Sequence, residues 1–285
     1  MTGTPASGKV WVMRIWGIFW AAFGLVLLVC CVSQTFHDQR FSESEVLSGP
    51  TITVTPADPN QFSFAVVGDL HIGSDTSRFR SILQAAQAEG DQFIVCLGDM
   101  VDQGELAEYQ AYQQAITDLG WQGKVLSLIG NHEIFENGWT HYKSELGPSH
   151  YQVTIGNSSF IALDTADGSV GTSQTDWLKA QLAKARPTHT FLLTHYLPTV
   201  PGIRTYLRLS DDFEALSLMK IARDAGVSAW MGGHYHSYAL GEVEGVKYLL
   251  AGGGGGRRMQ PITEYFFVQA TVSGSSVSFN RRTVE

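Results

Sequence analysis

The chain has 285 residues, of which 44% are hydrophobic, and its formal net charge at pH 7 is −8. This length and apolar content allow one large globular domain with a substantial core, or two smaller domains. The negative charge excludes attraction of nucleic acid by bulk electrostatics, so an anionic ligand would need a local positive feature.

The first predicted element is an uncharged stretch at residues 15–32. Its 18 residues suit a membrane-spanning helix, because each residue advances a helix by about 1.5 Å. Basic residues precede the stretch and acidic residues follow it, which predicts a cytoplasmic N-terminus at residues 1–14 and a single-pass signal anchor at residues 15–33. The remainder is then extracytoplasmic, either periplasmic or extracellular. A cleaved signal peptide and a lipid-modified Cys30 or Cys31 are the alternatives.

Residues 34–60 are polar and contain three prolines, which predicts a linker between the membrane and a single domain at residues 61–285. In that domain, stretches with strand-like and helix-like patterns alternate. Strands are predicted at residues 62–67, 92–97, 124–129, 190–194 and 227–231, and helices at residues 77–89, 105–119, 175–185 and 213–225. A hairpin is predicted at residues 151–163, and the last strands at residues 247–250, 265–271 and 275–280. Alternation followed by β-rich segments predicts a mixed α/β fold of two packed sheets with helices outside.

Five short segments, each at or just after a predicted strand, carry side chains that bind metal ions. They are Asp69-Leu70-His71, Gly98-Asp99-Met100-Val101-Asp102, Gly130-Asn131-His132-Glu133, His195 and Gly233-His234-Tyr235-His236. The ends of parallel strands share one edge of a sheet, so these segments can meet. The candidate metal ligands are Asp69, His71, Asp99, Asn131, His195, His234 and His236. A mixed set of oxygen and nitrogen donors suits Mn, Fe, Zn or Ni rather than Ca or Mg alone.

Charge counting predicts what such a centre would do. Two divalent ions bring about four positive charges, and the only charged candidate ligands, Asp69 and Asp99, offset two of them. With a bridging hydroxide the centre stays net positive, which favours a phosphate ester whose phosphorus the hydroxide attacks. His132 is predicted to protonate the leaving oxygen as a general acid. Asp102 is predicted to accept the ring proton of His132 and so to fix its tautomer.

The five segments, in this order, resemble the calcineurin-like metallophosphoesterases, whose pattern is D-x-H, G-D-x-x-D, G-N-H-D/E, a single His and G-H-x-H. The resemblance covers about residues 61–285 and implies a four-layer αββα sandwich of two mixed sheets flanked by helices. It implies the His132–Asp102 pair and two metal ions drawn from Mn, Fe and Zn. It also implies one ion on Asp69, His71, Asp99 and His236, and the other on Asp99, Asn131, His195 and His234.

Departures from the family pattern narrow the subfamily. Serine/threonine protein phosphatases have arginines where this chain has Gln103 and Ile129, which argues against that activity. The hairpin and the helix with Trp177 resemble the purple acid phosphatase branch. That branch has a tyrosinate iron ligand where this chain has Asp102, so no purple charge-transfer band is expected.

Possible substrate contacts lie outside these motifs. Arg204 and Arg208 lie between His195 and the next helix, and His141 follows the G-N-H-E segment. Residues 252–256 are all glycine and form either a phosphate cradle or a flexible loop. The predicted protein is a membrane-tethered phosphoesterase that acts on a small phosphorylated substrate and has no nucleic-acid partner. Open alternatives are a phosphodiesterase for cyclic nucleotides or phospholipid headgroups instead of a phosphomonoesterase, and a non-catalytic cell-surface binding protein on the same fold.

Overall fold

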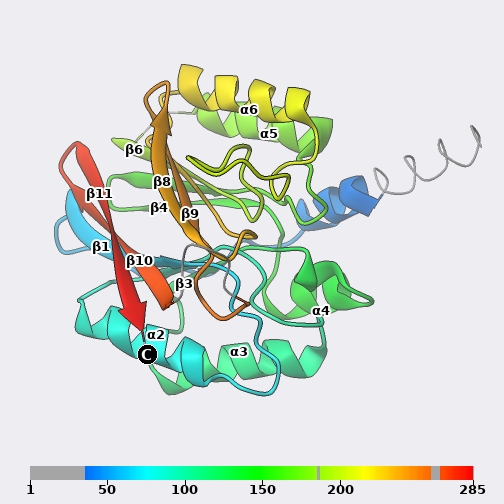
Figure 1. The fold of residues 1–285 in the computed structure, drawn as a ribbon, viewed down its shortest axis with the longest axis vertical. Helices are drawn as coiled ribbons and strands as arrows, with labels where there is room; N and C mark the ends of the chain where they lie inside the picture. Colours follow the sequence, from blue (N-terminus) through cyan, green and yellow to red (C-terminus); the bar gives the residue numbers. More distant parts are fainter. Residues whose placement is uncertain (1–35, 185–186, 258–263, 285) are drawn as a thin grey trace, which may run out of the picture.

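The computed structural model describes residues 36–184, 187–257 and 264–284. Two β-sheets lie face to face, and helices cover the outer side of each (Figure 1). This arrangement confirms the predicted mixed α/β fold with two mixed sheets flanked by helices. The predicted signal anchor at residues 15–33 lies outside the described residues. Within the described part of the chain, no helix combines the length and the apolar character that a membrane crossing requires.

The first sheet has the strand order β11-β10-β1-β2-β3. Strands β1, β2 and β3 are parallel to one another, and β3 forms one edge of the sheet. Strand β10 runs antiparallel to both of its neighbours, β1 and β11. The strands are β1 (Gln61–Val67), β2 (Ile94–Cys96), β3 (Val125–Ser127), β10 (Tyr265–Ser273) and β11 (Ser276–Val284). Helices α2 (Ser77–Ala88) and α3 (Leu106–Asp118) cover its outer face (Figure 1).

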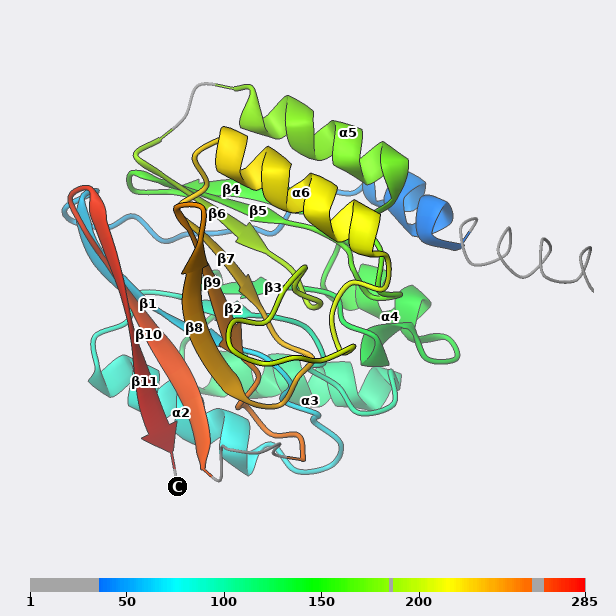
Figure 2. The same ribbon diagram turned by 45° about the horizontal axis from the view of Figure 1, so that its top comes forward.

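The second sheet has the strand order β4-β5-β6-β7-β9-β8. Its inner strands β5, β6, β7 and β9 are parallel, and the edge strands β4 and β8 are antiparallel to their neighbours. The strands are β4 (Tyr151–Ile155), β5 (Ser158–Ala162), β6 (His189–Leu193), β7 (Ala229–Gly232), β8 (Tyr238–Val243) and β9 (Val246–Ala251). Helices α5 (Gly171–Leu182) and α6 (Asp212–Asp224) lie side by side over its outer face (Figure 2).

Three apolar layers hold these four layers of secondary structure together. In β1, alternate side chains point to opposite faces, so Phe64 and Val66 enter the layer between the sheets while Ala65 and Val67 face the helices. The rings of Phe64 and Phe93 stack at 4.7 Å between centroids, and both are fully buried. Burying one such ring stabilises the fold by about 1.5–3 kcal/mol. The middle layer therefore fixes the two sheets against each other.

One α-helix and one β-strand of the domain were not predicted. Helix α4 (Gly138–Glu145) has only eight residues and begins with glycine, so its periodicity is weak. Strand β8 joins β9 through a two-residue turn in which Glu244 and Gly245 both have positive φ, at 50° and 82°. These angles match the turn that tight hairpins favour.

The predicted linker packs against the domain from residue 36 onward. Residues 36–44 form a helix, and the fully buried Arg40 donates to the carboxylate of Asp164 from Nε at 2.9 Å and from Nη2 at 3.1 Å. Further along, the backbone N–H of Thr53 donates to the carbonyl of Gly123 at 2.9 Å. The polar composition predicted a tether, and it does not reveal that Arg40 has a buried partner 124 positions away.

Candidate metal centre

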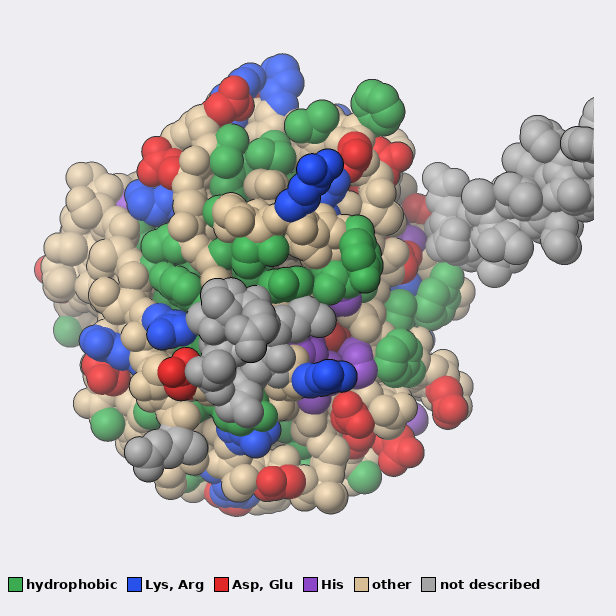
Figure 3. Space-filling view, in the orientation of Figure 1, with side chains coloured by type: hydrophobic (Ala, Val, Ile, Leu, Met, Phe, Trp, Pro, Cys, Tyr) green, Lys and Arg blue, Asp and Glu red, His purple; other side chains and the backbone are tan. Residues whose placement is uncertain are grey.

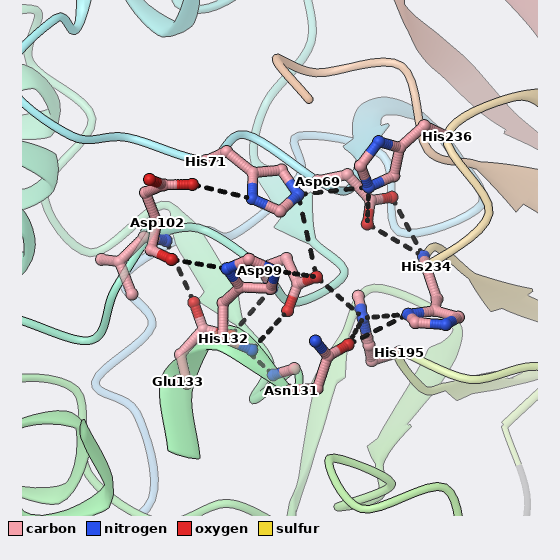
Figure 4. A network of polar contacts seen from close by, with 12 residues as sticks. Asp69, His71, Asp99, Asp102, Asn131, His132, Glu133, His195, His234 and His236 are labelled. Atoms are coloured by element: carbon pink, nitrogen blue, oxygen red, sulfur yellow. Dashed lines mark hydrogen bonds and ion pairs between the residues drawn. The ribbon is translucent and has the colours of Figure 1, made fainter. Parts of the chain in front are cut away.

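The loops that carry the predicted ligands meet where strands of both sheets end. Backbone hydrogen bonds link these loops to one another: the N–H of Asp69 donates to Gly98 O at 3.0 Å, and that of His71 donates to Asp99 O at 3.0 Å. In the second sheet, the N–H of Gly233 donates to His195 O at 2.9 Å. In Figure 4 the side chain of Asp99 lies in the middle of the resulting cluster. The segments therefore form one site rather than separate loop ends.

Four of the predicted ligands have left-handed backbone conformations. Their φ angles are 61° at Asp69, 47° at His71, 51° at Asp99 and 68° at His234. Non-glycine residues adopt this region at a cost of about 1–3 kcal/mol each, unless the surrounding structure enforces it. Such strain is typical of functional sites, and it directs these side chains toward one another.

Glu133 holds the loops after β2 and β3 together. Its fully buried carboxylate accepts four backbone hydrogen bonds, from Gly130 at 2.7 Å, Asp99 at 2.8 Å, Met100 at 2.7 Å and Val101 at 3.1 Å. Burial and the nearby Asp99 raise the pKa of Glu133, whereas the backbone donors oppose that rise. The sequence left the role of Glu133 open, since nothing local shows that its carboxylate faces the backbone of residues 99–101.

A first group of side chains consists of Asp69, His71, Asp99 and His236. One ligand atom from each lies within 4.8 Å of the others. His71 Nε2 is 3.2 Å from His236 Nε2 and 3.8 Å from Asp99 Oδ2, and His236 Nε2 is 3.5 Å from Asp69 Oδ1. These are the residues that the resemblance assigns to one metal ion.

A second group consists of Asp99, Asn131, His195 and His234. His195 Nε2 lies 3.2 Å from Asp99 Oδ2 and 3.1 Å from Asn131 Oδ1. His234 Nδ1 lies 3.0 Å from Asn131 Oδ1 and 3.2 Å from His195 Nε2. Asp99 Oδ2 belongs to both groups, as expected of a bridging carboxylate. The structure thus brings all seven predicted ligands together, while metal binding by each of them stays a prediction.

The tautomers of two histidines fit metal binding. His195 Nδ1 lies 2.9 Å from Leu97 O, and His236 Nδ1 lies 2.8 Å from Arg257 O. Because a carbonyl oxygen only accepts, each Nδ1 carries a proton, which leaves Nε2 as the ring nitrogen that faces the cluster. Carbonyl groups orient metal-binding histidines in this way. The nitrogen and carboxylate donors fit transition-metal ions.

The protonation of the metal-free cluster follows from burial and from Asp99. Burial lowers the pKa of His71 to about 4 and that of His234 to about 3, so both rings are neutral near pH 7. Burial also lowers the pKa of His195, but Asp99 raises it more, to about 9. Burial raises the pKa of Asp69 to about 6. His195 is therefore protonated near pH 7, and its Nε2 lies 3.2 Å from Asp99 Oδ2.

His132 and Asp102 are in contact, but not through the predicted atoms. His132 Nδ1 lies 2.5 Å from the main-chain oxygen of Asp102, whereas the Asp102 carboxylate lies 3.5 Å from His71 Nδ1 and is 46% exposed. The backbone N–H of Asp102 donates to Ile72 O at 3.1 Å, which holds the Asp102 loop against the loop of His71. His132 Nε2 faces the cluster, 3.9 Å from Asp99 Oδ2.

The predicted substrate contacts have partners outside the two groups. Arg204 and Arg208 line a cavity of about 640 Å³, whose lining includes none of the candidate ligands. Arg208 also pairs with Asp212 at 2.5 Å. His141 Nδ1 binds the carbonyl of Gly104 at 2.8 Å and so fixes the loop that follows Asp102.

The glycine-rich loop after β9 packs against the loop of Asp69 and His71. The N–H of Gly254 donates to Gly68 O at 3.0 Å, and that of Gly256 donates to Asp69 O at 2.8 Å. A Cβ atom on Gly255 would overlap the carbonyl oxygen of Leu70. These contacts support the Asp69 loop and use two of the N–H groups that a phosphate cradle would need.

The cluster is reachable from outside. Figure 3 shows histidine side chains gathered on one face of the molecule, with a basic side chain beside them. The side chains of His71, His132 and His236 are 11%, 23% and 17% exposed. A small anion can therefore approach the side where the two groups meet.

Comparison with known proteins gives a consistent result. The family model described as calcineurin-like phosphoesterase matches residues 62–238. A protein of Rhodococcus erythropolis named probable cyclic nucleotide phosphodiesterase is 24% identical over 197 residues, which cover 65% of each chain. A Mycobacterium tuberculosis protein named cAMP/cGMP dual specificity phosphodiesterase is 26% identical over 168 residues, or 55% of this chain and 52% of that protein. This chain thus spans about half to two thirds of the length of these relatives.

A purple acid phosphatase from Lupinus luteus has a similar structure, with a TM-score of 0.65 and 16% sequence identity. The similarity covers 80% of this chain and 53% of the lupin protein. At this identity, the comparison shows a shared fold and no more.

Proposed function

The chain belongs to the calcineurin-like phosphoesterase family, and from this premise we propose that it is a metal-dependent phosphoesterase that hydrolyses phosphate diesters at a two-metal centre. The observation that carries the proposal is the pair of donor groups that share Asp99 Oδ2. The first group would hold one ion and the second group the other, with Mn, Fe or Zn as the ions that suit these donors. When bound, the ions would supply positive charge for the phosphate and make hydroxide available near neutral pH.

His132 is proposed as the general acid. Its Nδ1–H donates to the main-chain oxygen of Asp102, so a second proton can reside only on Nε2, which faces the cluster. As the bond from phosphorus to the leaving oxygen breaks, that oxygen takes the Nε2 proton and departs as a neutral hydroxyl. Asp102 orients the ring through its carbonyl, and its carboxylate lies beside His71.

Two observations favour a diester over a monoester. Gln103 and Ile129 occupy the positions at which protein phosphatases place phosphate-binding arginines. A diester carries one negative charge and a monoester about two at neutral pH, so the diester needs fewer side-chain cations. The names of the two bacterial relatives also point to 3′,5′-cyclic nucleotides, which are diesters, as the first substrates to test.

The test combines metal analysis with hydrolysis of bis(p-nitrophenyl) phosphate, p-nitrophenyl phosphate and cyclic AMP. We expect two ions per chain and a higher kcat/KM for the diester than for the monoester. Asp99→Asn should lose both metal and turnover, whereas His132→Ala should keep its metal and lose turnover most on a poor leaving group. A preference for the monoester would favour a phosphomonoesterase. No hydrolysis with any of Mn, Fe, Zn, Ni or Co would favour the non-catalytic binding protein.

We also propose that residues 15–33 hold the domain at the outer side of a membrane. The support is the uncharged sequence at residues 15–32 and the basic residues that precede it. Alkaline extraction of membranes from expressing cells, with and without residues 1–35, tests the anchor. Release of the full chain by that treatment would contradict it, and protease access to the domain in intact cells or spheroplasts would establish its side.

A further inference from the structure

Tyr196 contacts three of the four side chains in the second group. Its hydroxyl donates to Asn131 Oδ1 at 3.2 Å. Its ring lies 3.8 Å from the ring of His234 and 5.2 Å from that of His195, measured between centroids. Tyr196 belongs to none of the sequence motifs, and the sequence shows only that it follows His195.

The position of Tyr196 is fixed by the backbone. The buried hydroxyl oxygen of Thr165 accepts from the N–H of His195 at 3.1 Å and from the N–H of Tyr196 at 3.0 Å. Thr165 follows β5, which is paired in parallel with β6. The Tyr196 ring is therefore held relative to the second sheet, while Asn131 comes from a loop of the first sheet. The phenol joins the two sheets at the cluster.

The hydrogen bond to Asn131 selects one orientation of its amide. An amide oxygen can bind a cation, whereas an amide nitrogen only donates hydrogen bonds and cannot. With Oδ1 toward Tyr196, the same oxygen also lies 3.1 Å from His195 Nε2 and 3.0 Å from His234 Nδ1. The hydroxyl donor thus favours the orientation in which the amide oxygen of Asn131, and not its nitrogen, faces His195 and His234.

We propose that Tyr196 is a positioning residue that strengthens metal binding by the second group in preference to the first. The inference rests on the proposed two-metal centre. The histidines of the first group are held by other means, His236 by the carbonyl of Arg257 and His71 by the carboxylate of Asp102. Loss of the phenol hydroxyl should therefore weaken one of two binding steps and spare the other.

The experiment is a zinc titration of the metal-free full chain in competition with a chromophoric chelator, which gives two dissociation constants. Tyr196→Phe should raise one constant about tenfold or more, the usual effect of losing such a supporting contact, and leave the other within about twofold. Tyr151→Phe is the matched control, because that buried phenol donates to Ser127 O at 3.0 Å and contacts neither group. It should leave both constants unchanged.

A double-mutant cycle separates positioning from a general loss of structure. If Tyr196 acts through Asn131, the variant Asn131→Ala with Tyr196→Phe should bind zinc no more weakly than Asn131→Ala alone. Additive losses, equal weakening of both steps, or no change in either would overturn the inference while leaving the two-metal proposal intact. A wild-type chain that binds fewer than two ions would overturn both.

Discussion

Replacing Arg40 with methionine should destabilise the domain by about 3–5 kcal/mol at pH 7, because a buried carboxylate loses its partner. Arg40 is fully buried, Asp164 is 1% exposed, and two hydrogen bonds of 2.9 and 3.1 Å join them. Burial raises the pKa of Asp164, but Arg40 lowers it more, to about 2. Compared with an unfolded value near 3.9, that shift alone corresponds to about 2.6 kcal/mol. Methionine retains the apolar part of the arginine side chain, so the loss of stability measures the effect of removing the positive charge.

The destabilisation should depend on pH with a definite sign. In the wild type the folded pKa of Asp164 lies below its unfolded value, so its contribution is complete above about pH 4 and is lost as the pH falls toward 2. In Arg40→Met, burial without the guanidinium raises the folded pKa above the unfolded value. The ionised carboxylate then disfavours folding at neutral pH, and protonation relieves it. The difference between the two proteins should therefore be largest near pH 7 and should shrink toward pH 4.

Urea unfolding followed by tryptophan fluorescence at pH 7 and pH 5 measures the effect, and an unchanged m value shows that the same transition is observed. Arg80→Met is the control, because the pair of Arg80 and Asp118 has side chains 33% and 39% exposed and solvent screens it. Combining Arg40→Met with Asp164→Asn should recover part of the loss, since an amide needs no counter-ion. A loss below about 1 kcal/mol for Arg40→Met, or one that does not vary with pH, would refute this reasoning.

Three further substitutions test other contacts. Glu133→Gln leaves four backbone donors facing one acceptor oxygen. We therefore expect the free energy of unfolding, measured in urea, to fall by about 2–4 kcal/mol and the metal content to fall as well. Full metal retention would count against the role of Glu133 in holding the loops. Burial raises the folded pKa of Asp91 to about 6, so its carboxylate costs stability as the pH rises from about 4 to 6. Asp91→Asn should therefore gain about 1–3 kcal/mol at pH 8 and nothing at pH 4, and an equal gain at both would be inconsistent with this. Gly255→Ala should lower the thermal midpoint because its Cβ overlaps Leu70, whereas Gly49→Ala, with nothing within 4 Å, should not.

The location of the candidate centre could be predicted because it depends on short-range patterns. Asp69 and His195 each come two residues after the end of a buried parallel strand, and Asp99 comes three residues after the end of another. The ends of parallel strands share one edge of a sheet, so these side chains are expected near one another even when the register of the strands is unknown. The two sheets could be predicted for a similar reason, since β1 and β10 coincide with apolar runs of strand length.

Contacts between distant segments could not be predicted in this way. The buried pair of Arg40 and Asp164 spans 124 positions, and neither residue lies in an apolar pattern that would indicate burial. His132 Nδ1 meets the main-chain oxygen of Asp102 and not its carboxylate, in a loop that pairs with the loop of His71 through the bridge between Ile72 and Val101. The residue types therefore predict which side chains lie close together, whereas the pairing of the backbone determines which of their atoms are in contact.

The electrostatics of the centre link its fold to its chemistry. Asp69, Asp99 and Glu133 are at most 1% exposed, and three buried carboxylates so close together oppose folding unless positive charge or N–H donors offset them. Glu133 is offset by four backbone N–H groups, and Asp99 by the proton on His195. Asp69 accepts from the N–H of His234 at 3.0 Å through both oxygens, yet its pKa remains raised. The remaining negative charge is concentrated where the two donor groups meet, which supports the proposal that cations bind there.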